Sequence, residues 1–334
     1  MRKVLLATSA LVAAGAVSSA SADVSVSAYY EFGYSSISDN ITSTVRTDPD
    51  GTFTDSEVHF KFDTTSDSGL NFGAVFETEG TTSASGTDEA SMYISTADMG
   101  KLILGENDEA SDSFQTWLPG GRNMATGADG ASAKKADNSS IAAGLKGYAN
   151  DAQFGDTTRA SYMSPSLGGL TLGVSYAQVS GTTGDNADSS MGLAYSTEMM
   201  GASITLKAST RSDGESGDGS KNATAYGISA SQGDLSQAAS TVSEETKGTH
   251  KATRNGYGIG YTVNDKLSVA ANIVNASDDT SKDELTTTSI GASYTIAPGL
   301  NFAIAFNSSE FDEDGGSNND MTTDEIRASI QANF

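Results

Sequence analysis

The chain has no cysteine among its 334 residues, and it has only four prolines, two histidines and one tryptophan. Without cysteine it forms neither a disulfide nor a thiolate metal site, so non-covalent contacts alone hold the fold. Basic residues are also scarce: 19 lysines and arginines stand against 43 aspartates and glutamates, and the formal net charge at pH 7 is −24. Nucleic acid and anionic lipid surfaces would repel such a chain, so this charge argues against both as partners.

Histidine is too scarce for most hydrolase active sites. A Ser-His-acid site needs a histidine within hydrogen-bonding reach of its nucleophile. The chain offers only His59, in an expected strand, and His250, in an expected loop, and no G-x-S-x-G elbow surrounds a serine. We therefore predict that the protein is not an enzyme and that it carries no cofactor.

Long apolar runs are missing except at the N-terminus. There, Arg2 and Lys3 precede the apolar stretch Val4–Val17, and Ala20-Ser21-Ala22 forms an A-x-A cleavage site. This is the order of a secretory signal peptide, and its apolar stretch is too short for a transmembrane anchor. We predict a signal peptide at residues 1–22 and an exported domain at residues 23–334. No other segment approaches the ~20 apolar residues of a membrane helix.

What the chain does contain is short segments in which apolar and polar residues alternate. In the last ten residues isoleucine, alanine and phenylalanine occupy every second position. Successive side chains of a strand point to opposite faces, so this pattern predicts strands with one apolar and one polar face. The predicted strands are Val24–Tyr34, Ser56–Asp63, Leu70–Phe76, Glu89–Ser95, Lys101–Glu106, Thr157–Ser164, Leu170–Val179, Ser190–Ser196, Ala202–Ser209, Thr224–Ser231, Leu235–Val242 (the weakest), Arg254–Val263, Leu267–Asn275, Thr286–Ile296, Leu300–Asn307 and Glu325–Phe334.

The connections favour a barrel over a soluble β-sandwich. Short turns alternate with longer loops rich in Asp, Gly, Ser and Thr, as in outer-membrane barrels. A sandwich would need a dry inner face, whereas the second face here is polar. An apolar last strand left as a free edge would promote aggregation, so we expect Glu325–Phe334 to pair with Val24–Tyr34. The predicted fold is all-β: a transmembrane antiparallel β-barrel of about sixteen strands.

One connection is much longer than the others. It runs from Asn107 to about Asp156, which is too long for a plain loop in a compact domain, and it begins with the acids Asp108, Glu109 and Asp112. A barrel of about sixteen strands leaves an aqueous channel. We predict that this loop folds into the lumen and narrows it.

Four stretches carry a family resemblance: Asp67–Ala74, Gly100–Glu106, Tyr162–Pro165 with Leu170–Tyr176, and the terminal Phe334. In their order and spacing they resemble Gram-negative general diffusion porins of the sixteen-stranded, trimeric α-proteobacterial type. The resemblance implies an outer-membrane location, a homotrimer, and a third external loop folded into the barrel with its acids facing basic wall residues. Phe334 is similar to the signal read by the barrel-assembly machinery, which implies that machinery as a partner.

Candidate pore residues lie on the predicted strand 56–63, whose polar face carries Glu57, His59, Lys61 and Asp63. These four face the lumen if Phe60 faces lipid. Charged rings select ions in pores, so Lys61 opposite Asp108, Glu109 or Asp112 would set a transverse field across the constriction. The alternative is that they are ordinary lumen charges away from the narrowest point.

Two arginines are further candidates. Arg159 shares a polar face with Thr157 and Ser161, and the same two interpretations apply to it. Arg122 lies inside the long loop, where it either contributes to the constriction or pairs with the acids of the loop and shapes it.

The acidic loops suggest, but do not define, metal sites. Segments 48–55 and 312–316 resemble fragments of Ca²⁺ loops, yet neither has the twelve-residue order of such a loop. We assign no metal site and expect at most weak Ca²⁺, shared between acidic loops and the phosphates of lipopolysaccharide.

The function predicted from these features is passive diffusion of small hydrophilic solutes and ions through an outer-membrane channel. The excess of acids, with Asp108, Glu109 and Asp112 beside a wall poor in Lys and Arg, predicts a weak cation preference. Glu106, where many such porins have a basic residue, argues against strong anion selectivity. Two alternatives stay open. A substrate-specific channel would need an aromatic or arginine ladder, for which Tyr29 and Tyr93 are the hints. A non-conducting surface or adhesive β-protein would use the acidic loops for contact.

Overall fold

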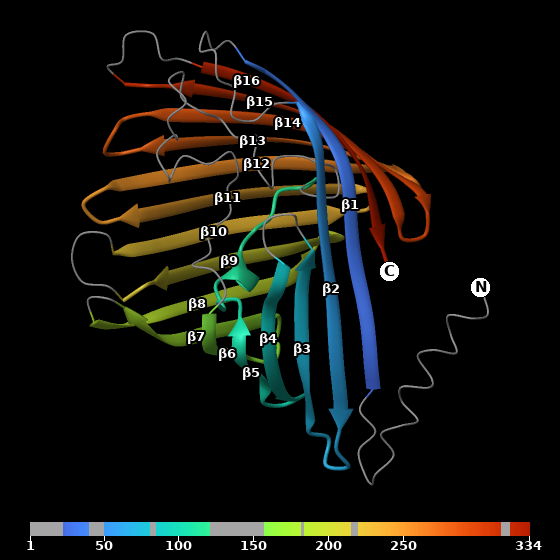
Figure 1. The fold of residues 1–334 in the computed structure, drawn as a ribbon, viewed down its shortest axis with the longest axis vertical. Helices are drawn as coiled ribbons and strands as arrows, with labels where there is room; N and C mark the ends of the chain where they lie inside the picture. Colours follow the sequence, from blue (N-terminus) through green and yellow to red (C-terminus); the bar gives the residue numbers. More distant parts are fainter. Residues whose placement is uncertain are drawn as a thin grey trace.

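The computed structural model describes residues 23–39, 50–80, 85–120, 157–181, 184–214, 220–314 and 321–334. These residues form a closed barrel of sixteen antiparallel strands, each paired with its neighbours in sequence (Figure 1). The strands are β1 (Asp23–Asp39), β2 (Gly51–Thr65), β3 (Asn71–Gly80), β4 (Ser85–Thr96), β5 (Gly100–Asn107), β6 (Thr157–Met163), β7 (Leu170–Gly181), β8 (Gly184–Met199), β9 (Ala202–Ser212), β10 (Lys221–Gln232), β11 (Leu235–Thr246), β12 (His250–Asn264), β13 (Leu267–Asp278), β14 (Glu284–Ala297), β15 (Leu300–Asp312) and β16 (Met321–Asn333). The predicted fold class is confirmed. The predicted signal peptide lies outside the described residues.

The barrel closes where β16 meets β1. Ile330 stands opposite Phe32, and the main chain of Phe334 forms two hydrogen bonds with Ala28, with N–O distances of 2.9 and 3.3 Å. The predicted pairing of these strands is confirmed. β16 faces Tyr29–Asp39, so the first residues of β1 pair with β2 alone.

The two faces of the wall differ as the alternation predicts. Large apolar side chains point outward, with Phe32 at 50% and Ile330 at 49% exposure. Inward positions carry small and polar side chains such as Ser289, Ser309 and Gln331, which are buried. An apolar band of this extent fits the lipid-facing surface of a membrane barrel. Among the described residues no helix is long and apolar enough to cross a membrane.

Several strands run further than predicted at the rim that bears the longer loops. β9 continues past Ser209 to Ser212, and β12 begins at His250 rather than at Arg254. Beyond the apolar band the alternation fades, but ladder hydrogen bonds to the neighbouring strands continue. The weak segment Leu235–Val242 is confirmed as part of β11, because pairing with β10 and β12 holds it extended.

Candidate functional site

The chain that follows β5 turns into the barrel and runs along its inner wall (Figure 1). Residues 108–120 lie on the inner wall from β6 to β13. The backbone N–H groups of Ala110 and Ser111 donate to Ser175 Oγ on β7 and Ser190 Oγ on β8, at 3.1 and 3.0 Å. Further along, Lys207 Nζ on β9 donates to the carbonyl oxygen of Gln115 at 2.9 Å. The predicted inward fold of this loop is confirmed for residues 108–120, and residues 121–156 lie outside the described part of the chain.

The loop lies close to the wall because several wall positions beneath it are glycines. A Cβ built on Gly192 would stand 2.7 Å from the Cβ of Phe114, and one on Gly258 would stand 2.8 Å from Pro119 Cδ. Real Cβ atoms do not approach other atoms this closely. The glycines that form this seat are Gly173 on β7, Gly192 on β8, Gly227 on β10, and Gly258 and Gly260 on β12; they meet Phe114, Thr116, Leu118 and Pro119 of the loop.

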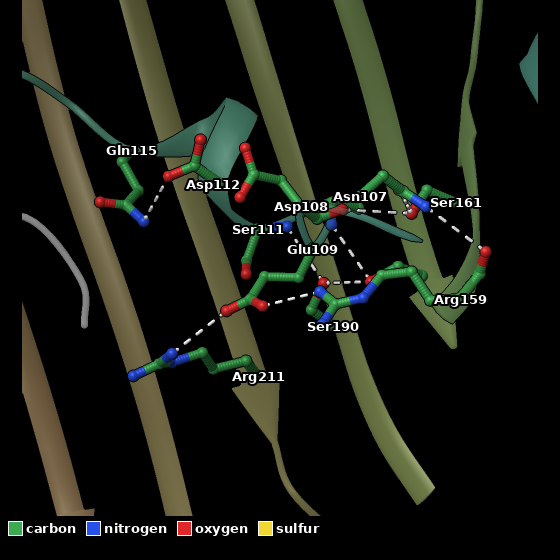
Figure 2. Close-up of polar contacts among 12 residues, drawn as sticks. Asn107, Asp108, Glu109, Ser111, Asp112, Gln115, Arg159, Ser161, Ser190 and Arg211 are labelled. Atoms are coloured by element: carbon green, nitrogen blue, oxygen red, sulfur yellow. Dashed lines mark hydrogen bonds and ion pairs between the residues drawn. The ribbon is translucent and has the colours of Figure 1, made fainter. Parts of the chain in front are cut away.

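Glu109 fastens the loop to two strands at once. Its Oε2 is 2.7 Å from Arg159 Nη1 on β6, and its Oε1 is 3.1 Å from Arg211 Nη1 on β9. Figure 2 shows the carboxylate pointing into the wall between the two guanidinium groups. All three side chains are at most 5% exposed. A buried charge that loses its partner is strongly destabilising, so these contacts depend on one another.

The other predicted loop acids are placed differently. Asp108 is exposed. Asp112 begins a single turn of 3-10 helix, Asp112–Phe114, and accepts a hydrogen bond of 3.2 Å from Gln115 Nε2 (Figure 2). Arg122 lies outside the described residues, so its pairing stays a prediction.

The predicted residues of β2 share the inner face, because Phe60 and Phe62 between them point outward and are exposed. Lys61 Nζ pairs with Asp63 at 3.2 Å, and in the described part of the chain it pairs with no acid of the loop. In a closed ring of sixteen strands β2 lies opposite β10, which carries part of the loop seat. The transverse field between Lys61 and the loop stays a prediction.

His59 lies between two carboxylates on this wall. Its Nε2 is 3.1 Å from Glu57 and its Nδ1 is 3.0 Å from Glu77 on β3. Glu77 was not among the predicted site residues. The register places it directly opposite His59, a relation that alternation within one strand does not reveal.

Comparison with known proteins decides the family. The family model described as Gram-negative porin matches residues 7–314. The chain belongs to this family. Two solved structures share its fold: the anion-selective porin from Comamonas acidovorans (TM-score 0.64, 16% identity, covering 94% of this chain and 100% of that chain) and an engineered variant of the Rh. blastica porin (TM-score 0.62, 16% identity, covering 93% and 100%). No curated protein sequence matches the chain. Family and fold place this porin in the bacterial outer membrane.

The porin holds its loop with residues that the sequence pattern did not single out. Arg211 lies beyond the predicted end of its strand at Ser209, whereas β9 extends to Ser212 and points Arg211 inward. Lys207 is at an inward position of the same strand. The sequence signal for the position of the loop was the presence of glycine and serine at inward positions of successive strands. Such small residues leave room for another segment of the chain to pack against the wall.

Tyr93, one of the two tyrosines considered for an aromatic ladder that binds solutes, makes other contacts in this porin. The Tyr93 hydroxyl donates to Asp63, and the ring of Tyr93 has Lys101 Nζ at 4.6 Å and Lys61 Nζ at 5.7 Å from its centre. Tyr93 is only 4% exposed. Its face is used in cation–π contacts and is not available for stacking on a solute.

Proposed function

We propose that this porin forms a water-filled channel for passive diffusion of small hydrophilic solutes and ions, and that it is not an enzyme. The observation that carries the proposal is the closed sixteen-stranded barrel whose loop lies flat on one wall. A barrel of this size leaves an aqueous lumen, and polar inward side chains keep it wet. Pore width and charge, and not a binding step, then decide which solutes pass.

We further propose a weak cation preference. Each described wall arginine has an acid nearby: Arg159 and Arg211 share Glu109, Arg254 Nη1 is 3.0 Å from Glu244, and Arg327 Nη2 is 3.9 Å from Glu31. These carboxylates offset part of the positive charge that the guanidinium groups bring to the wall. The Comamonas porin of similar fold is described as anion-selective, so the fold alone does not decide whether a pore prefers cations or anions.

In a planar bilayer, the refolded protein is expected to give single-channel current steps that are proportional to voltage. Under a salt gradient, the sign of its reversal potential is expected to indicate a preference for cations. Steps blocked by one sugar or anion would instead indicate a substrate-specific channel. An absence of steps would indicate a non-conducting surface protein. A reversal potential of anionic sign would contradict the cation preference while leaving diffusion intact.

The proposed partners are two further copies of the chain in a homotrimer, outer-membrane lipid with lipopolysaccharide, and the barrel-assembly machinery. Any Ca²⁺ would be held weakly, between the acidic loops and lipopolysaccharide.

Loss of Phe334 is expected to lower the amount of assembled barrel in cells, because this last residue resembles the signal that the barrel-assembly machinery reads. Refolding of the same variant in detergent is the control and is expected to proceed. Equal surface levels of the variant and the parent protein would contradict this role.

A further inference from the structure

A second polar cluster lies on the lumen wall, away from the loop seat. It consists of Glu57 and His59 on β2 and Glu77 on β3. One oxygen of each glutamate and one ring nitrogen of His59 lie within 4.8 Å of one another. All three side chains are partly exposed, with exposed fractions of 24%, 34% and 19% in that order. The cluster is therefore open to water and ions.

The spacing of these three atoms is close to that of ligands on one metal ion. Zinc takes a histidine nitrogen at about 2.0–2.1 Å and a carboxylate oxygen at about 2.0–2.2 Å, so two of its ligands are at most about 4.3 Å apart. Small side-chain rotations at the lumen surface would close the difference. In this structure each ring nitrogen of His59 lies beside one glutamate, so an ion bound at one nitrogen would replace the contact between that nitrogen and its carboxylate.

The charge of the cluster also favours a cation. A carboxylate oxygen of Glu57 lies within 4.8 Å of one of Glu77. Glu79 stands opposite Glu57 in the register, so a third acid lies beside this pair. Two carboxylates this close repel each other unless a proton or a cation lies between them. Lys61, the next cation on this face, pairs with Asp63 instead.

We propose that Glu57, His59 and Glu77 form a site for a first-row divalent metal ion, such as Zn²⁺, on the lumen wall of this porin. An imidazole with two carboxylates suits Zn²⁺, Ni²⁺ or Cu²⁺ better than Ca²⁺ or Mg²⁺, which prefer oxygen ligands alone. Three protein ligands leave a position for water, so the ion exchanges with the solution in the lumen. When it is bound, the ion adds positive charge to a wall across from the loop and so lowers cation flow.

Zinc titrated into the detergent-refolded full-length protein and followed by calorimetry tests the site. The parent protein is expected to bind one Zn²⁺ per chain with saturation. His59→Gln and, separately, Glu77→Gln are expected to weaken binding by about tenfold or more, because each removes a ligand or its carboxylate partner. His250→Gln is the matched control, since it removes the only other histidine, and it should bind like the parent. Excess Ca²⁺ should leave binding unchanged.

No saturable binding at millimolar zinc would overturn the proposal. So would equal affinity in His59→Gln, because the ion would then sit on acids elsewhere. Displacement by Ca²⁺ would overturn the assignment to a transition-metal ion. Binding is measured without a membrane, so a failed channel assay and a failed metal assay are separate results.

Discussion

Glu109→Ala is expected to free the inserted loop and shift the pore toward anions. The substitution removes the carboxylate that contacts Arg159 at 2.7 Å and Arg211 at 3.1 Å. It leaves two guanidinium groups without this shared counter-charge inside the wall. One unit charge acts on an ion 4 Å away with about 1 kcal/mol in water-like surroundings, about a fivefold change in relative permeability. Reversal potentials under a salt gradient measure this shift.

The same variant should also lose stability. Removing one partner of a buried ion pair typically costs about 3–5 kcal/mol, much of it from the charge left behind. The expected readouts are a lower denaturant midpoint and larger current fluctuations in the open channel, because the loop has lost a charged anchor. Glu109→Gln keeps the size of the side chain and separates the loss of charge from the loss of packing.

Asp108→Ala is the matched control for this prediction. Asp108 is the preceding acid and has the same charge, but it is exposed and not enclosed in the wall. Its loss removes the same charge from the loop but leaves the contacts of Glu109 with Arg159 and Arg211 in place, so stability should stay nearer to that of the parent. If Asp108→Ala and Glu109→Ala lower the denaturant midpoint equally, the buried contacts of Glu109 are not what holds the loop.

The outer face and the closure of the barrel could be predicted from sequence because they depend on local pattern. Phe32 and Ile330 each occupy an apolar position of an alternating strand, and lipid requires apolar side chains at such positions. Which residues of β1 face β16 could not be predicted, because alternation fixes the face of a residue but not its partner. The part of β1 that pairs with β16 runs from Tyr29 to Asp39 and so extends past the predicted strand end at Tyr34.

The site was only partly predictable for the same reason. Arg159 and Glu109 were both expected at the pore, yet they are fifty residues apart, and nothing local shows that Arg211 completes their contact. Lys61 has the predicted face but takes its neighbour Asp63 as partner, since that carboxylate is two positions away on the same face. Contacts between the strands and the loop form only when the barrel closes, and the alternation of residues within one strand carries no information about them.

The glycine seat leads to the second large expected effect. Gly192→Val should push the loop off the wall into the lumen and lower single-channel conductance. Its Cβ would fall 2.7 Å from that of Phe114, which the fixed β-strand behind it cannot relieve. Overpacking of this kind typically costs about 1–3 kcal/mol, so the barrel should still fold while the loop moves. Met191→Val is the control, because this neighbouring residue points outward and is 55% exposed.

Gly173 allows a test by suppression. A Cβ there would come 3.0 Å from Cζ of the Phe114 ring, and its other close neighbour is the flexible end of Met163. Gly173→Val alone should lower conductance, and adding Phe114→Ala should restore most of it, since the ring that blocks the new side chain is gone. A double variant that conducts no better than Gly173→Val would show that the two residues act independently. The flat position of the loop would then depend on its polar anchors, Ser175 and Ser190, and not on the missing side chains of the wall.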